Sequence, residues 1–465
     1  MRRIKDEFAR RTSFRGLIGA LPPLLSHPLI KWVILGTATR LMLAPFTMWS
    51  DTQWFLIWSW RLLGNPGPLL SYSIYPPPFH LLTFIFIKPI SMIVDPSNFA
   101  VDTPQELQEI WSRWGFKQFY VTTPIFNLVY KLPYMTTDLL IGLILYRMTE
   151  ERLGNPFVSR NVFALWYINP FIMVVSSVMG QNDSIVSLAM LLSVFLLLHR
   201  SHIFAGISVS LAFLLKTYNV LTIPFLLVAI GLKRPASLST KLAGRMDPAV
   251  LARFAAGFAL PFLLLLPSLR YFGLPWQVRV TAPNLGGFTF WGVLRFSPSA
   301  NWIIEWGYSM MNNEFILGVA IAAASTLIIL LKLRDLHNVL IFGILAVLTS
   351  TFLGLPLVNP HNLLILLPFM ILASVESRRY TLGYWLLSCS GFVYIMFMLG
   401  PFVVTEPWVI FVQPHRVNEL VQITSWYMTR SGFLTPSLNY DLMTISSTIG
   451  FGTLVSLLVP PMRAK

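Results

Sequence analysis

Charged residues are scarce in this sequence of 465 residues. Asp, Glu, Lys and Arg make up 11% of it, whereas 55% is hydrophobic and the mean hydropathy is +0.66. A soluble domain carries about 25% charged residues, so the composition excludes an ordinary soluble protein and predicts an all-α, polytopic integral membrane protein. The single cysteine, Cys389, excludes a disulfide framework and a cysteine-based metal site.

The motifs of cofactor-dependent chemistry are missing as well. There is no Asp-x-Asp to hold a metal-bound nucleotide sugar, no glycine loop for a phosphate or a dinucleotide, and no His/Cys/Asp cluster with metal-ligand spacing. We therefore predict neither a cofactor nor a metal. The 34 Lys and Arg outnumber the 19 acidic residues, but they are scattered over short loops, as the positive-inside rule places them. The predicted partner of these loops is the lipid bilayer and not a nucleic acid.

The distribution of Lys and Arg predicts the topology of a single multi-pass domain that includes the whole chain. Residues 1–26 form a basic cytoplasmic head, and the basic segment 233–253 lies on the same side. Counting apolar runs from these loops gives about 12 or 14 transmembrane helices, because either one or three crossings fit between residues 75 and 147. The external loops are expected at 50–78, 270–313 and 402–441.

The stretch 179–184 reads Met-Gly-Gln-Asn-Asp-Ser and separates two apolar runs. Gln181, Asn182 and Asp183 are costly next to hydrocarbon unless they face an aqueous or protein-lined cavity. Parity places them on the external face, together with the other polar clusters of this apolar sequence, such as residues 359–362. This convergence predicts a polar pocket at the external face.

Asp51 heads an aromatic segment that is too short to cross the bilayer. We expect this segment to lie in the interface, with Trp54, Trp58 and Trp60 as belt residues. One interpretation of its start is a helix cap, because residues 50–53 fit a capping box. The other is that Asp51 is a general base at the membrane surface, where a carboxylate can take a proton from an attacking sugar hydroxyl.

Arg40, Lys131, Asp138 and Lys216 lie within or at the edges of apolar runs. A charge there costs about 2.5–3.5 kcal/mol even on the lenient insertion scale. One interpretation is structural, as snorkelling side chains or an Arg40–Asp138 pair. The other is that the Lys and Arg among them neutralise a lipid phosphate at the external interface. Lys216, near the external end of its run, fits the second alternative.

Three more cations lie on the predicted external face. Arg279 and Arg295 belong to an aromatic loop, and arginine is suited to bidentate phosphate recognition. The alternative is an ordinary amphipathic loop. His361, which precedes an apolar run, is either a structural histidine or a further contact to a phosphate oxygen.

Six landmarks occur in an order that resembles the GT-C superfamily of membrane glycosyltransferases, and they cover most of the chain. They are Asp51 after the first apolar run, Tyr75-Pro-Pro, the segment 130–138, Asn169-Pro170 followed by 180–183, the segment 215–219, and Pro360-His361-Asn362. The chain looks closest to the polyprenyl (dolichyl)-phosphate-sugar-dependent glucosyl- and mannosyltransferases of lipid-linked oligosaccharide and glycosylphosphatidylinositol-type glycolipid assembly. Asn362 departs from the acidic residue of the glucosyltransferases.

The resemblance implies a GT-C fold and an inverting hexosyltransferase. Mannose or glucose would move from a polyprenyl- or dolichyl-phosphate carrier to a lipid-linked glycan or glycolipid acceptor on the non-cytoplasmic face. By this resemblance Asp51 is the catalytic base. The donor phosphate would contact Lys216, His361, Arg279, Arg295 and Lys131. The substrates would contact Gln181, Asn182, Asp183, Tyr75, Tyr218 and Trp54.

Two other functions remain open from the sequence. One is a flippase or transporter of lipid-linked sugars, and the other is a non-catalytic subunit of a membrane glycosylation complex. The C-terminal residues contain no retrieval signal, which favours a prokaryotic (archaeal or bacterial) cell membrane over the endoplasmic reticulum membrane.

Overall fold

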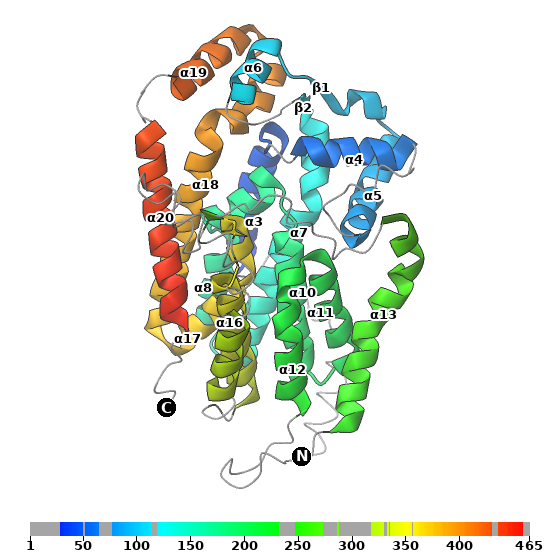
Figure 1. Ribbon diagram of the computed structural model, residues 1–465, viewed down its shortest axis with the longest axis vertical. Coiled ribbons are helices and arrows are strands. Elements are labelled where there is room, and N and C mark those ends of the chain that lie inside the picture. Colours follow the sequence, from blue (N-terminus) through cyan, green and yellow to red (C-terminus); the bar gives the residue numbers. More distant parts are fainter. Residues whose placement is uncertain are drawn as a thin grey trace.

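The computed structural model is a bundle of helices that run along its long axis, with shorter elements across one end (Figure 1). It describes residues 28–49, 52–64, 77–113, 119–231, 247–272, 286–287, 318–329, 333, 335–355, 357–429 and 436–458. Among these residues the strands form two short pairs, β1 (Ala100–Asp102) with β2 (Tyr120–Thr122) and β3 (Gly286–Gly287) with β4 (Leu357–Val358). The predicted all-α, polytopic architecture is confirmed.

The predicted interfacial helix after the first apolar run is present as α4. The chain rises through α3 (Ile30–Leu43) and a 3₁₀ turn (Ala44–Phe46), and α4 (Thr52–Gly64) then lies across the bundle axis (Figure 1). Trp54 is 41% exposed, as a belt residue should be, but Trp58 is only 7% exposed and packs in the core. The prediction that Trp58 faces the interface is therefore wrong, because α4 buries that face against the bundle.

Gln53, the last residue of the predicted capping box, bonds to another segment of the chain, while residues 50 and 51 lie outside the described residues. Its Oε1 accepts a hydrogen bond of 2.9 Å from the backbone N–H of Phe119, on the segment that leads into β2. Trp60 is tied to the same end of the molecule, because its Nε1 donates to the carbonyl oxygen of Pro96 at 2.7 Å. These two bonds fasten α4 to the shorter elements beside it.

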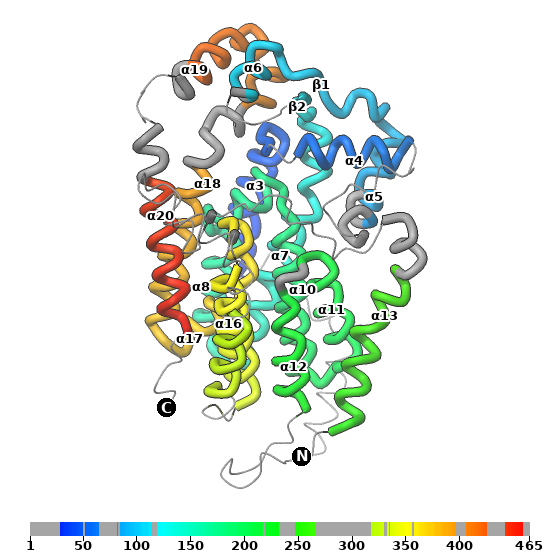
Figure 2. The backbone as a smooth tube through the Cα atoms, in the orientation of Figure 1, coloured from blue at the N-terminus to red at the C-terminus, as the bar shows by residue number. Residues whose placement is uncertain are grey.

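The elements across this end form a cap on the bundle. After α5 (Pro77–Ser91), β1 pairs with β2 in antiparallel register, with Val101 opposite Val121. Between the strands lies α6 (Gln105–Arg113), which packs on α19 (Val417–Thr429) through Leu107, Ile110 and Leu420. Figure 2 shows the same meeting of the light-blue α6 with the orange α19.

The long helix α7 (Pro124–Leu153) and the following α8 (Pro156–Tyr167) have clear sequence boundaries. Each helix has proline at its first position, where the missing N–H costs nothing. Gly154 ends α7 with a φ of +63°, a left-handed conformation that glycine adopts without strain. Asn155 caps α8, since its Oδ1 accepts from the N–H groups of Phe157 at 3.0 Å and Val158 at 3.3 Å.

The next span is broken. α9 (Pro170–Met173) continues as a π-helical turn (Val174–Met179), and this unit is bent by 45° from α8. Asn169 starts α9, because its Oδ1 accepts from the N–H of Phe171 at 2.8 Å. The chain then turns through Gly180 into α10 (Asp183–Leu198). The broken span therefore delivers residues 180–183 to the interior of the protein.

Seven further helices complete the described bundle. They are α11 (His202–Leu215), α12 (Thr222–Gly231), α13 (Pro248–Phe272), α16 (Leu336–Leu353), α17 (Leu367–Glu376), α18 (Arg378–Val412) and α20 (Pro436–Leu457). A shorter apolar helix covers residues 318–329.

Among the described residues, α7, α13 and α16 are each long and apolar enough to cross a membrane, and there are four such spans if the bent pair of α8 and α9 is counted as one. Between residues 75 and 147 only α7 passes this test among the described residues, which favours one crossing there. The total of about 12 or 14 spans stays a prediction. The span in α16 is 78% buried and that in α13 only 17%, so α13 presents most of its apolar surface outward (Figure 1).

Charged residues at the ends of several helices meet at one end of the bundle. Arg152, at the end of α7, contacts Asp335 at 3.1 Å and Glu376 at 3.6 Å, and the neighbouring Glu151 contacts His199 at 3.3 Å. These contacts join the ends of α7, α10 and α17 to the start of α16. Two residues predicted to be external lie at the opposite ends of two of these helices, Asp183 at the start of α10 and His361 in the turn before α17. Which end faces the cytoplasm remains a prediction from the Lys and Arg distribution.

Candidate functional site

Three helix ends bring the predicted polar residues together. Asp183 is the first residue of α10, a position where the helix dipole favours a carboxylate. Lys216 follows α11, at the point where the backbone becomes extended with a φ of −146°. His361 and Asn362 come from a 3₁₀ turn, η7 (Pro360–Ile365). Lys216 and His361, 145 positions apart, therefore converge on Asp183, as the parity of the spans predicted.

The contacts within this Asp183 cluster are long. Lys216 Nζ lies 3.3 Å from each carboxylate oxygen of Asp183, and His361 Nε2 lies 3.9 Å from Oδ2. Charge-assisted N–H···O bonds are normally about 2.7–2.9 Å. Asn362 Oδ1 is 3.4 Å from Lys216 Nζ, and the opposite orientation of this amide places its nitrogen 3.2 Å from Asp183 Oδ1.

Several polar atoms around the cluster have unfilled hydrogen-bonding capacity. Both amide atoms of Asn182 and Nδ1 of His361 are buried and have no hydrogen-bond partner among the described residues. Buried polar side chains are normally paired with protein or ordered water. The Lys216 side chain is 18% exposed, whereas that of Asp183 is fully buried. The cluster can therefore hold a polar group that approaches beside Lys216.

Gly180 positions this cluster. Its φ of +65° lies in the left-handed region, and its carbonyl oxygen accepts from Tyr130 Oη at 2.9 Å. A Cβ at this position would lie 2.8 Å from the Tyr130 ring and 3.1 Å from Lys131 Cγ. Glycine is thus required both by the backbone conformation and by the close approach of α7.

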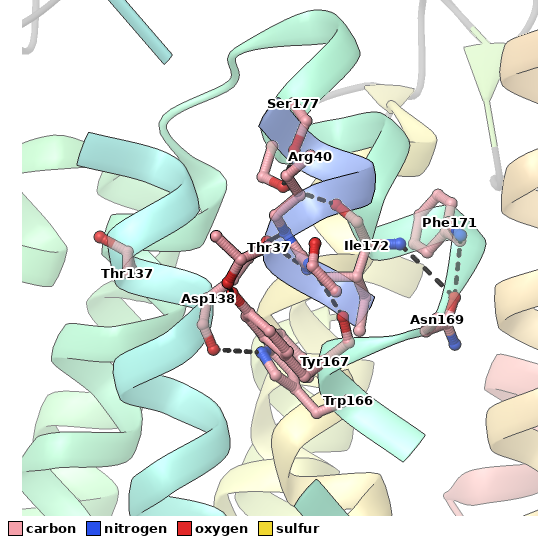
Figure 3. A network of polar contacts seen from close by, with 12 residues as sticks. Thr37, Arg40, Thr137, Asp138, Trp166, Tyr167, Asn169, Phe171, Ile172 and Ser177 are labelled. Atoms are coloured by element: carbon pink, nitrogen blue, oxygen red, sulfur yellow. Dashed lines mark hydrogen bonds and ion pairs between the residues drawn. The ribbon is translucent and has the colours of Figure 1, made fainter. Parts of the chain in front are cut away.

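A second buried ion pair lies beside the break between α8 and α9 (Figure 3). Arg40 of α3 donates to Asp138 Oδ2 of α7 from Nη2 at 2.9 Å and from Nε at 3.2 Å, and both side chains are fully buried. Its Nη1 donates to the carbonyl oxygen of Tyr167 at 2.6 Å. Trp166 Nε1 donates to the carbonyl oxygen of Asp138 at 2.9 Å. The suggested Arg40–Asp138 pair is confirmed, and it supports the end of α8.

The other side of the break is held by α18. Asn169 Nδ2 donates to Tyr384 Oη and, at 3.2 Å, to Ser388 Oγ. Tyr384 Oη in turn donates to the carbonyl oxygen of Leu165, near the end of α8. Tyr384 is almost completely buried. The break is therefore a fixed feature supported by α3, α7 and α18.

Lys131 has a different role from the phosphate contact predicted for it. Its ammonium group donates to the carbonyl oxygens of Ala44, at 3.0 Å, and Thr47, and also to Thr47 Oγ1 at 3.1 Å. A lysine has three N–H donors, so all of them are used at the end of the 3₁₀ turn after α3. The side chain is fully buried, which leaves it no access to a lipid head group.

The remaining predicted site residues are not brought to the cluster by any described contact. Trp54 lies on the exposed face of α4. Asp51, Tyr75, Arg279 and Arg295 lie outside the described residues, as does the side chain of Tyr218. Within the residues that are described, no group of three His, Cys, Asp or Glu side chains is placed to hold a metal ion.

Two tyrosines of α7 were missed as parts of the site. Tyr134 Oη donates to Tyr130 Oη at 3.3 Å, and Tyr130 reaches Gly180 beside the cluster. The spacing Tyr130, Tyr134, Asp138 is the helical i, i+4, i+8 pattern. This pattern was visible in the sequence and places all three side chains on the face of α7 that meets the broken span.

The predicted resemblance to the GT-C glycosyltransferases is overturned by comparison with known protein families. Residues 107–278 match the family model of the GPI transamidase subunit PIG-U, which is a subunit and not a hexosyltransferase. The predicted enzyme activity, the polyprenyl-phosphate-sugar donor and the lipid-linked glycan acceptor are therefore wrong. One physical reason is that Lys131, a polar residue that the membrane bundle uses to hold a helix end, was interpreted as a phosphate contact.

The matched segment contains the part of the fold on which the Asp183 cluster is built. It runs from α6 to just beyond α13, and so includes α7, the broken span, α10 and α11. No curated protein matches the chain. Over less than half of its length, the chain is thus similar to the GPI transamidase subunit PIG-U.

Proposed function

We propose that this protein is a non-catalytic, membrane-embedded subunit of a complex of the GPI transamidase type. The match of residues 107–278 to the PIG-U family model carries the proposal. Its partners are then the other protein subunits of that complex, and the whole chain forms one multi-pass domain. The proposed location is the endoplasmic reticulum membrane, in place of the prokaryotic membrane that the sequence favoured.

The internal pairing of the described ionic groups supports a structural role. A catalytic group has to reach the substrate, at about 2.6–3.2 Å from the proton it transfers. Arg40, Asp138 and Lys131 are fully buried and bonded to protein atoms. Asp183 is buried beside Lys216, so its charge is compensated by the protein itself. These groups stabilise helix ends and a helix break.

Affinity purification tests the proposal directly. The full chain, tagged and expressed in its own cells, is extracted in a mild detergent, and the proteins that copurify are identified by mass spectrometry. We expect transamidase subunits in near-stoichiometric amounts, and we expect deletion of the gene to lower the amount of GPI-anchored reporter at the cell surface. A monodisperse, correctly inserted protein that brings down no transamidase subunit would overturn the proposal.

An Asp51→Asn variant separates a subunit from an enzyme. A non-catalytic subunit does not need the Asp51 carboxylate for proton transfer, so this variant should restore the surface reporter to within about twofold of wild type, the range expected of a minor stability change. The matched control is Asp138→Asn, which removes a carboxylate that supports the fold. If Asp51→Asn assembles normally but loses all function, a purely structural role is wrong.

A further inference from the structure

His199 lies between two hydrogen-bond acceptors at the charged end of the bundle. Its Nδ1 is 2.8 Å from the carbonyl oxygen of Phe195, one turn back in α10, and its Nε2 is 3.3 Å from Glu151 Oε2 at the end of α7. The other oxygen of Glu151, Oε1, accepts from Arg147 Nε at 2.6 Å. Both carboxylate oxygens of Glu151 are therefore engaged by cationic or potentially cationic groups.

The number of protons on the ring decides whether both contacts are bonds. A neutral imidazole has one N–H, and the imidazolium ion has two. The carbonyl oxygen of Phe195 can only accept, and so can the ionised carboxylate of Glu151, which the adjacent Arg147 stabilises. The geometry around His199 is thus fully satisfied only when the ring carries both protons.

We infer that the contact between His199 and Glu151 is a pH-sensitive latch between α7 and α10, closed when His199 is protonated. Loss of one proton leaves Nε2 or Nδ1 facing an acceptor with no hydrogen between them, so one of the two bonds is lost. If the remaining proton is on Nδ1, the hydrogen bond from α10 to Glu151 of α7 is lost; if it is on Nε2, that bond loses the charge of the imidazolium ion and is weaker.

The charges that act on His199 come from α7. Glu151 favours the imidazolium ion, Arg147 opposes it, and the ring packs on that of Phe195 with centroids 4.3 Å apart. The hydrogen bond to Glu151 raises the pKa of His199 above 6.5, while partial burial acts in the opposite direction. The stabilisation is therefore present below pH 6.5 and is lost as the pH rises through the higher pKa of the folded state.

This inference does not rest on the proposed function. It concerns the end of α10 opposite to Asp183, where the next residue of α7, Arg152, also contacts Asp335 and Glu376. Opening of the latch would free the end of α10 and leave α7 joined to α16 and α17. The predicted consequence is local, confined to the last turns of α7 and α10.

Hydrogen exchange measured by mass spectrometry on the purified full chain tests the latch. Wild type, His199→Gln and Glu151→Gln are compared at pH 6.0, 7.0 and 8.0, and the ratio of variant to wild-type exchange at each pH cancels the intrinsic pH dependence of exchange. For peptides that contain residues 147–153 and 195–201, we expect a ratio of about fivefold at pH 6.0 that falls towards one at pH 8.0, as expected for loss of one charge-assisted bond.

His202→Gln is the matched control. His202 lies three residues further on, and the charges around it are those of Arg253, Asp247 and Arg200 and not that of Glu151. Its ratio should not show the fall expected of His199→Gln. Glu151→Gln removes the same contact from the α7 side and keeps the test decisive if His199→Gln folds poorly. Ratios for both latch variants that stay near one at pH 6.0, or that are equal at pH 6.0 and 8.0, would overturn the inference.

Discussion

Two ion pairs in the interior of the described part of the chain, Arg40–Asp138 and Lys216–Asp183, differ in how closely their charged groups approach. Arg40 and Asp138 are both fully buried and 2.9 Å apart, and Arg40 makes further bonds to the backbone. Lys216 and Asp183 are 3.3 Å apart, and the lysine side chain is 18% exposed. The first pair is the more closely bonded of the two, with Asp138 Oδ1 left without a hydrogen-bond partner among the described residues. The second pair has longer printed contacts, and its neighbours Asn182 and His361 have buried polar atoms without a hydrogen-bond partner among the described residues.

Breaking the tight pair should have the largest effect on stability. Asp138→Asn leaves the Arg40 guanidinium buried without its counter-charge, which costs about 3–5 kcal/mol. That is a large share of the about 5–15 kcal/mol that stabilises a typical domain. We expect little monodisperse protein in detergent, and a clearly lower midpoint of thermal unfolding for what remains.

The double variant Arg40→Met with Asp138→Leu is the control for this prediction. Replacing both charges by apolar side chains is often neutral, so it should recover much of the stability lost in Asp138→Asn. Equal stability of Asp138→Asn and wild type would show that the tight pair is not needed.

Breaking the loose pair should have a smaller effect. Asp183→Asn keeps a polar group at the start of α10, and the partly exposed Lys216 can turn towards solvent. We expect a loss of about 1–2 kcal/mol, as for one polar contact, measured as the same shift in thermal unfolding. If Asp183→Asn lowers the midpoint of thermal unfolding as much as Asp138→Asn does, the two pairs do not differ in their contribution to stability.

The smallest effects should come from two glycines with the same backbone conformation. Gly154 has a φ of +63° and nothing within 4 Å of the position of a Cβ, whereas Gly180, with a φ of +65°, has the Tyr130 ring at 2.8 Å. Gly154→Ala should cost about 1 kcal/mol for the left-handed conformation alone, and Gly180→Ala more. If both variants lower the midpoint of thermal unfolding equally, the loop before Asp183 can move to make room for the added methyl group. The contacts around the Lys216–Asp183 pair would then be as easily displaced as the pair itself.

The convergence of Asp183, Lys216 and His361 could be predicted because it depends only on span parity. Each residue lies at the end of an apolar run, and runs of similar length place such ends together. The sequence also suggested the Arg40–Asp138 pair, as one of two alternatives. Unpaired charges within spans are costly, so opposite charges at similar depth are expected to meet.

The role of Lys131 could not be predicted in this way. Its acceptors are the backbone carbonyl oxygens of Ala44 and Thr47, which every residue has and no sequence pattern marks. The burial of Trp58 likewise depends on how α4 is laid on the bundle. The function was predicted wrongly because the order of such residues along the chain was taken as evidence of catalysis, whereas fold-level resemblance does not establish function.

The support of the helix break by α18 bears on the order in which the chain can mature. Tyr384, which accepts from Asn169, follows it by 215 residues. At a synthesis rate of about 5–20 residues per second, the bend between α8 and α9 waits about 10–40 s for this bond while the remaining helices emerge. Until then the side-chain amide of Asn169 and the carbonyl oxygen of Leu165 have no Tyr384 hydroxyl to bind. A nascent chain released before α18 is made therefore lacks the Tyr384 contact at the bend between α8 and α9, far upstream of its own C-terminal end.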